Sequence, residues 1–140
     1  VRGKGRFHAV KYRESAELPD REYPFILSTG RLLYQFHTGT MTRKSDSIEN
    51  VAGSPFVEVN SEDAKQLGIG EGDTVRVRSR RGEILLKART GEMVEKGVVF
   101  VPFHYAEAAV NLLTNDALDP TAKIPEFKVC AVALEPAQKP

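Results

Sequence analysis

A polar cluster between Ser28 and Arg43 has the residue types of a ligand-binding site. Its sequence is STGRLLYQFHTGTMTR, in which hydroxyl side chains, glycines, arginines and a histidine follow directly after an apolar segment. Small side chains that form hydrogen bonds, next to glycines that let backbone amides approach closely, suit a polar ligand that carries phosphate. A protein core would leave many of these groups unsatisfied. The cluster is therefore the first candidate for a functional site.

The beginning of this cluster has the groups that bind a phosphate or a pyrophosphate. Thr29 has a hydroxyl, Gly30 an open backbone amide, and Arg31 a guanidinium that can bind an anion through two hydrogen bonds. So short a string is equally typical of an ordinary turn with a solvated arginine. The run from residue 37 to residue 42, HTGTMT, is richer, and either a ligand or a water-filled loop would satisfy its polar groups.

A metal site and a nucleophilic centre are weaker interpretations of the same residues. His37 and His104 have metal-ligand chemistry, but no third clear ligand accompanies them. No serine lies in a nucleophile-elbow motif, and no spacing indicates a Ser-His-Asp triad. We therefore expect no metal site and no catalytic residue within this chain.

Length and charge indicate one domain without a general affinity for polyanions. The chain has 140 residues, with 20 Lys and Arg against 19 Asp and Glu and a pI near 8.0. One core is expected at this length, and so balanced a charge gives no field that attracts nucleic acid or a membrane surface. No apolar run approaches the roughly 20 residues that cross a bilayer, and the first residues have no apolar signal core. We predict a cytoplasmic chain that contacts neither nucleic acid nor a membrane.

The single cysteine and the first residue add two further expectations. Cys130 alone cannot form an internal disulfide or a metal site of several thiolates, and its apolar setting, VCAVAL, predicts that it packs in the core. The chain begins with Val1 rather than with an initiator Met. We therefore expect residues 1–140 to be a single domain and a fragment of a larger subunit.

The hydrophobic pattern predicts a small β-barrel with one or two short helices. An amphipathic strand over 5–12 and a linker to residue 24 would precede it. The strands expected in the barrel cover residues 25–27, 56–60, 74–79, 84–88, 98–103 and 128–134. A helix with Asn60 as its N-cap would end at Gly68, and one or two helical turns would lie within 105–117. Residues 40–55 have no sustained period and are expected to be a long loop, mobile without its ligand. Short strands in this number and spacing favour a closed, mainly β barrel.

A basic face between Arg76 and Arg89 leaves a second function open. Its cations could bind nucleic acid or a protein. No aromatic residues are interleaved to stack on bases, however, and Glu71, Asp73 and Glu83 dilute the charge. A solvated sheet face is the simpler interpretation.

Two other features of the sequence are weaker indications of function. A second polar cluster follows His104 and could either face the first cluster across a barrel rim or merely cap turns. Its members are Asn111, Thr114, Asn115, Asp116 and Asp119. The dipeptide Gly53-Ser54 is the sole support for a third function, that of a self-processing barrel.

Four motifs in order give the chain a family resemblance. They are STGRLLYQFHTGTMTR, PFVEVNSEDAKQLGI, FHYAEAAVNLLTNDALDP and IPEFK, and together they span nearly the whole chain. In these motifs the chain resembles the C-terminal domain of molybdenum- or tungsten-dependent formate dehydrogenase catalytic subunits, a molybdopterin-dinucleotide-binding domain of the dimethyl sulfoxide reductase superfamily. The resemblance implies a six-stranded double-psi β-barrel.

The same resemblance implies a bis(molybdopterin guanine dinucleotide) cofactor, with Mo or W, that this chain shares with domains it does not contain. The matching positions that would contact it are Thr29, Gly30, Arg31, Tyr34, His37, Thr38, Thr40, Met41, Thr42, His104, Asn111, Phe127 and Lys128. The implied partners are the remaining domains of a catalytic subunit, with an iron-sulfur cluster, and its electron-transfer subunits. The metal ligand of this family comes from an upstream domain, so the isolated chain is not expected to oxidise formate to carbon dioxide.

Overall fold

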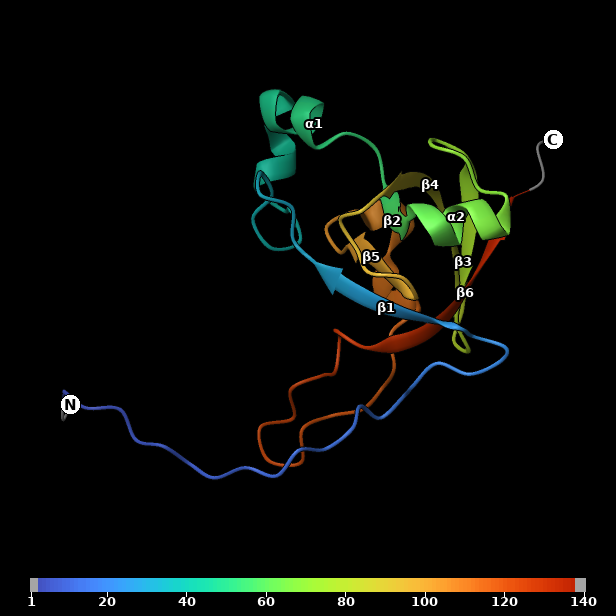
Figure 1. The fold of residues 1–140 in the computed structure, drawn as a ribbon. Helices are drawn as coiled ribbons and strands as arrows, with labels where there is room; N and C mark the ends of the chain where they lie inside the picture. Colours follow the sequence, from blue (N-terminus) through green and yellow to red (C-terminus); the bar gives the residue numbers. More distant parts are fainter. Residues whose placement is uncertain (1–2, 138–140) are drawn as a thin grey trace.

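Six strands close into a barrel in the computed structural model, which describes residues 3–137 (Figure 1). The strands are β1 (Phe25–Gly30), β2 (Phe56–Asn60), β3 (Thr74–Arg78), β4 (Glu83–Gly91), β5 (Val98–Pro102) and β6 (Cys130–Pro136). Their order around the barrel is β1-β5-β2-β4-β3-β6. The pairs β1 with β5 and β2 with β4 are parallel, whereas the other neighbours are antiparallel. The predicted six-stranded, mainly β double-psi barrel is confirmed.

The alternation of side chains along the strands places the core inside the barrel. In β3, Val75 and Val77 are fully buried, while Arg76 between them faces solvent. Val75 pairs with Leu86 and Val77 with Ile84 of β4, so apolar side chains from both strands meet on the inner face. Cys130 at the beginning of β6 is fully buried, as its apolar setting predicts.

Helix α2 (Ser61–Leu67) follows β2 and has the predicted boundaries. The side-chain oxygen of Asn60 accepts a hydrogen bond from the backbone N–H of Glu62 at 3.0 Å, which caps the helix. Gly68 ends the helix in a left-handed conformation, with φ of +67°, that a residue with a side chain rarely adopts.

The expectation of a loop over 40–55 is wrong for its central part. A 3-10 turn, η1 (Thr42–Lys44), leads into helix α1 (Asp46–Ala52), and Figure 1 shows this unit beside the barrel. Seven residues are too few for helical periodicity to emerge from the sequence. Its boundaries are nevertheless marked by Ser45 before the first turn and by Gly53 after the last.

Two other expectations concern residues outside the regular strands. The segment 5–12 is not a strand, because no described strand lies beside it to accept its backbone hydrogen bonds, and all its residues are exposed. The helical turns expected within 105–117 are present as two 3-10 turns, η2 (Ala106–Ala108) and η3 (Val110–Leu112). Over residues 3–137, no helix has the length and apolar character needed to span a membrane.

Replacing Asn60 with Ala tests the junction between β2 and α2. Besides capping the helix, the Asn60 amide donates a hydrogen bond to the carbonyl of Val94 at 3.0 Å. Losing both bonds is expected to lower the free energy of unfolding by about 1–2 kcal/mol in a denaturant titration. The control is Asn50→Ala, since Asn50 is exposed in α1 and its side chain bonds to no described residue. Equal losses in the two variants would contradict the capping role.

Candidate functional site

A cavity of about 550 Å³ opens at the rim of the barrel where β1 ends. Its lining residues are Thr29, Arg31, His37, Thr38, Phe103, Asn111, Phe127 and Lys128. All but Phe103 are among the residues that the sequence singles out. The structure therefore brings together residues from three stretches of chain that are far apart in sequence.

Parallel pairing explains why the first two of these stretches meet. Gly30, the last residue of β1, pairs with Pro102, the last residue of β5, so both strands end at the same rim. The backbone N–H of Phe103 continues the ladder with a hydrogen bond to the carbonyl of Gly30 at 3.1 Å. The loop that carries Arg31 and the segment that carries Asn111 consequently begin side by side.

The third stretch of chain that lines the cavity, Phe127 and Lys128, is hydrogen-bonded to the end of β1. The hydroxyl of Thr29 donates to the carbonyl of Phe127 at 2.8 Å, and the Lys128 ammonium group donates to the carbonyl of Thr29. Thr29 itself is buried at the floor of the cavity. Phe127 and Lys128 are therefore held at the rim although they follow Thr29 by almost a hundred residues.

The chemistry of the lining is cationic, aromatic and hydrogen-bonding. Arg31 and Lys128 bring positive charge, Phe103 and Phe127 bring rings, and no lining residue is a carboxylate. One guanidinium nitrogen of Arg31 lies 3.1 Å from Nδ1 of His37, a residue with φ of +51°. Such a donor set can bind an anion and a flat heterocycle at the same time.

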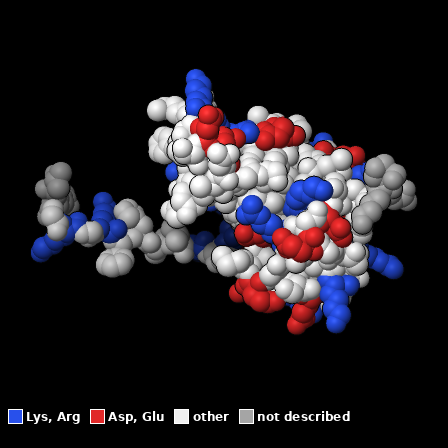
Figure 2. Space-filling model, turned by 90° about the horizontal axis from the view of Figure 1, so that it is seen from above, with Lys and Arg blue, Asp and Glu red and all other residues white. Residues whose placement is uncertain are grey.

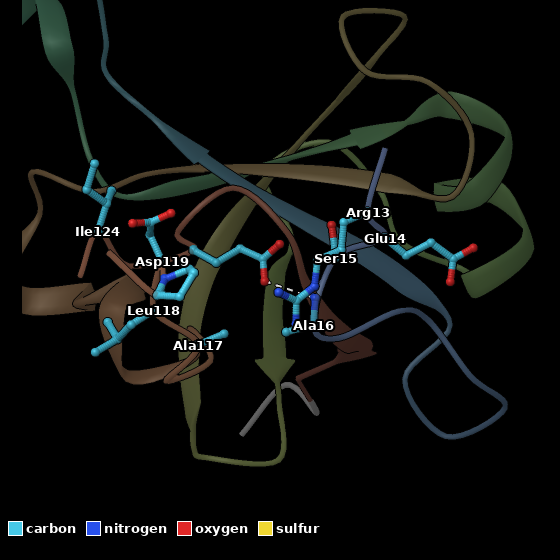
Figure 3. Close-up of a pocket in the computed structure, with 10 residues that line it drawn as sticks. Arg13, Glu14, Ser15, Ala16, Ala117, Leu118, Asp119 and Ile124 are labelled. Atoms are coloured by element: carbon cyan, nitrogen blue, oxygen red, sulfur yellow. Dashed lines mark hydrogen bonds between the residues drawn. The ribbon is translucent and has the colours of Figure 1, made fainter. Parts of the chain in front are cut away.

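Another cavity, of about 610 Å³, has a different character. It lies between the N-terminal segment around Arg13 and the loop that contains Leu118 and Ile124, and Figure 3 shows these two sides facing each other. The backbone N–H of Ala16 donates to a carboxylate oxygen of Glu126 at 3.0 Å across it. Three further cavities of the described chain also carry carboxylates, as this one does with Glu14, Asp119 and Glu126. The absence of lining carboxylates thus distinguishes the cavity at the rim from these four.

Two glycines of the first polar cluster lie close to other side chains of this chain. A Cβ on Gly30 would lie 2.5 Å from the ring of Phe100, and one on Gly39 would lie 2.6 Å from the side-chain stem of Arg43. Gly39 also has a φ of +74°. Both positions therefore need glycine for reasons inside this chain.

The other predicted site residues do not line the cavity. Tyr34, Thr40 and Met41 are exposed on the loop beside it, and their role as cofactor contacts stays a prediction. The Thr42 hydroxyl bonds within the chain, donating to the side-chain oxygen of Gln35 at 2.5 Å and accepting from the backbone N–H of Phe36 at 3.2 Å.

His104 is the most unusual of the predicted residues. Its side chain is only 2% exposed, and its ring lies against that of Tyr105 with centroids 3.8 Å apart and planes tilted by 41°. Neither ring nitrogen has a hydrogen-bond partner among the described residues. Burial lowers the pKa of His104 from its ordinary value of 6.5, and the positive charge of Arg43 acts in the same direction. The carboxylates of Glu49 and Glu107 act in the opposite direction.

The second polar cluster is divided by the fold. Asn111 faces the cavity, whereas Asn115 is buried, with its side chain donating to the carbonyl of Val129 at 2.8 Å and its backbone N–H to the sulfur of Cys130 at 3.2 Å. Thr114 bonds back to the carbonyl of Asn111 at 3.0 Å. Both expected roles, facing the first cluster and capping turns, therefore occur in it.

Sequence reasoning missed Phe103 and Arg43 as parts of this region. Phe103 lines the cavity next to His104 in the motif FHY, so the motif itself was the available indication. Arg43 ends the first polar cluster and forms ion pairs with Glu49 and Glu107. Nothing in the local sequence shows that Glu107, which is 64 residues away, is its partner.

Four arginines of the basic outer face are paired with neighbouring carboxylates. Its cations form ion pairs that join Arg76 to Glu83 and Glu135, Arg78 to Glu22 and Glu135, Arg80 to Glu17 and Asp20, and Arg81 to Glu17. Figure 2 shows basic and acidic groups lying next to one another over the visible face of the barrel. The simpler interpretation, a solvated sheet face, agrees with this pairing.

The burial of His104 leads to a prediction about acid stability. Because its folded pKa lies below 6.5, the unfolded chain takes up the proton first, so the free energy of unfolding falls as the pH is lowered from 6.5 toward the folded pKa. His104→Leu removes this proton-linked loss, and its unfolding free energy should vary less over that range. Denaturant titrations at several pH values measure the slope. His8→Gln, at an exposed histidine, is the control, and an unchanged slope in His104→Leu would contradict the prediction.

Comparison with known proteins agrees with this geometry. The family model described as "Molydopterin dinucleotide binding domain" matches residues 25–131. The chain is 57% identical over 133 residues to F420-dependent formate dehydrogenase subunit alpha of Methanocaldococcus jannaschii, a match that covers 95% of this chain and 20% of that subunit. It is 48% identical over 139 residues to a nitrate reductase of Symbiobacterium thermophilum, covering 96% of this chain and 18% of that protein.

A comparison with solved structures shows that the fold is shared as well. The chain superimposes on acetylene hydratase from Pelobacter acetylenicus with a TM-score of 0.72, at 17% identity, over 84% of this chain and 19% of that one. The chain thus spans about a fifth of the length of its curated relatives. Because the family model covers most of the barrel, from β1 into β6, the chain belongs to the molybdopterin dinucleotide binding domain family.

Proposed function

We propose that this chain binds the bis(molybdopterin guanine dinucleotide) cofactor of a formate dehydrogenase, as one domain of the catalytic subunit. The observation that carries the proposal is the cavity at the rim, where two cations, two aromatic rings, hydroxyls and an amide meet without a lining carboxylate. A pyrophosphate requires cations and N–H donors, and a pterin or guanine requires flat apolar contact with paired donors and acceptors at its edges. Membership of the family supports the dinucleotide as the ligand.

The lining residues fit this group by their chemistry. Arg31 and Lys128 would bind the phosphate oxygens, and Phe103 and Phe127 would pack against a heterocycle. The hydroxyl of Thr38 and the amide of Asn111 would bond to its polar edge, as would the two free nitrogens of His104 if the segment around it moves. When bound, the cofactor supplies the oxidation-reduction chemistry through its molybdenum or tungsten. The residues of this chain bind it and orient it.

The proposal also names formate as the substrate of the parent enzyme. Three relatives named as F420-dependent formate dehydrogenase alpha subunits are 57%, 51% and 47% identical to this chain, and the nitrate reductase is 48% identical. The two highest of these identities support formate, whose oxidation to carbon dioxide releases one proton and two electrons. Nitrate reduction is the second candidate, and the nitrate reductase relative is what favours it.

Further domains and subunits follow from the same proposal. The relatives are about five times as long as this chain, which supports a parent subunit that supplies the remaining cofactor contacts and the metal ligand. Electron-transfer subunits and an iron-sulfur cluster would carry the electrons away. The isolated chain would then bind without oxidising formate. A cytoplasmic location is part of this proposal.

A stand-alone barrel that binds nucleic acid or protein through the Arg76 to Arg89 face has less support. Ion pairs of Arg76, Arg78 and Arg80 already offset much of the positive charge of that face. Such binding would decrease steeply as salt is raised, because it depends on the release of counterions. Binding at the rim would depend less on salt, since stacking and hydrogen bonds contribute to it.

Replacing Arg31 with Ala tests the proposed site. The 140-residue chain, labelled with ¹⁵N, is titrated with molybdopterin guanine dinucleotide and separately with GDP at two salt concentrations. Amide shifts are expected over residues 28–43 and 103–128, and Arg31→Ala should weaken GDP binding about tenfold, because a charge-assisted bond is lost from an exposed site. The matched control is Arg76→Ala on the outer face, which should bind as the wild type does.

Two results would contradict the proposal. Shifts confined to the Arg76 to Arg89 face and removed by salt would favour the nucleic-acid alternative. Equal losses of folding stability and affinity in Arg31→Ala would indicate a structural arginine rather than a ligand contact.

A further inference from the structure

Arg43 connects two walls of the cavity without lining it. Its guanidinium donates to both carboxylate oxygens of Glu107, at 2.8 and 2.9 Å, in a two-bond arrangement. Its Nε contacts the carboxylate of Glu49 in α1 at 3.2 Å, and its Nη1 lies 3.4 Å from the carbonyl of His104. One side chain thus joins the end of the first polar cluster to α1 and to η2.

The two walls that Arg43 joins supply most of the residues that line the cavity. The loop before it contributes Arg31, His37 and Thr38, and the segment bonded to it contributes Phe103 and Asn111. The two stretches begin together at the rim, but beyond Gly30 and Phe103 the barrel ladder no longer holds them. One other side-chain bond links them, from the hydroxyl of Tyr105 to the carbonyl of Ala52 at 3.0 Å. In the described chain, charge-assisted contacts between these walls come from Arg43.

The surroundings of Arg43 are built around its side chain. Gly39 leaves room for the arginine stem, which a Cβ would meet at 2.6 Å, and the guanidinium lies 5.6 Å from the centroid of the Tyr105 ring. Glu49 also accepts from the side-chain amide of Gln35 at 2.8 Å. The Arg43 side chain is 26% exposed, so its ion pairs are partly shielded from solvent.

We propose that Arg43 is a positioning residue for the cavity, holding the loop of Arg31 to Thr38 against the segment of Phe103 to Asn111 in the geometry that binds the ligand. The inference rests on the proposed function, because the cavity must bind the dinucleotide for its positioning to matter. The planar fork of arginine is needed, since a lysine ammonium at this position cannot bond to both oxygens of Glu107 while also reaching Glu49.

Arg43→Gln tests the proposal with two independent measurements. Amide hydrogen exchange should become faster over residues 36–52 and 104–112, with no change in β2, β3 and β4, because the walls separate while the barrel stays folded. The affinity for GDP should decrease about tenfold in the same variant. Arg43→Lys should lie between the wild type and Arg43→Gln in both measurements.

Three further variants separate the effect of the ion pair from general effects of charge. Lys44→Gln removes one positive charge from the exposed neighbouring position and should leave exchange and affinity unchanged. Glu107→Gln should reproduce part of the Arg43→Gln effect. The double variant Arg43→Gln with Glu107→Gln should be no worse than Arg43→Gln alone, since the two residues act through one interaction.

The outcomes distinguish this inference from the proposed function. A wild-type chain in which GDP shifts no cavity amide contradicts the proposed function, and hydrogen exchange alone then decides whether Arg43 holds the walls together. Wild-type binding with unchanged exchange or unchanged affinity in Arg43→Gln overturns the positioning role. An effect of equal size in Lys44→Gln would also overturn it, because net charge would then explain the result.

Discussion

Parallel pairing between β1 and β5 is the constraint on which the candidate site depends. Because the two strands run in the same direction and end in register at Gly30 and Pro102, the polar segments that follow them emerge at one rim of a closed barrel. Closure also leaves these strands no freedom to shift, since each has a second neighbour, β6 for β1 and β2 for β5. The cavity at that rim is therefore a consequence of topology as much as of local sequence.

Charge is distributed very differently at the rim and over the rest of the barrel. On the outer face, arginines such as Arg78 and Arg80 are paired with carboxylates from the N-terminal segment and β6. At the rim, Arg31 and Lys128 are exposed beside aromatic rings and have no lining carboxylate. Total charge, which is close to zero, conceals this difference. An anionic ligand is attracted where cations are left unneutralised, so the local arrangement matters more than the sum.

A network of buried and half-buried polar groups supports the cavity from behind. Arg43 and Glu107 bridge its walls, and the neighbouring His104 is buried with neither ring nitrogen bonded to a described residue. An unpaired polar group in a low-dielectric interior is costly, so these nitrogens need an ordered water, a ligand or another protein group as their partner. Because Arg43 contacts both the carbonyl of His104 and the carboxylate of Glu107, the buried histidine belongs to the same set of contacts that joins the two walls.

The sequence by itself determined the mainly β barrel, the α2 helix with its Asn60 cap and Gly68 stop, the buried Cys130, and most of the residues that line the cavity. These follow from alternation, capping and residue chemistry, which are local properties. Tertiary structure decided what depends on distant partners. It left residues 5–12 without a strand because no neighbouring strand accepts their hydrogen bonds, and it joined Arg43 to Glu107. It also buried His104 next to Phe103 of the cavity lining and made Gly39 necessary for packing, because both depend on atoms that only the folded chain brings near.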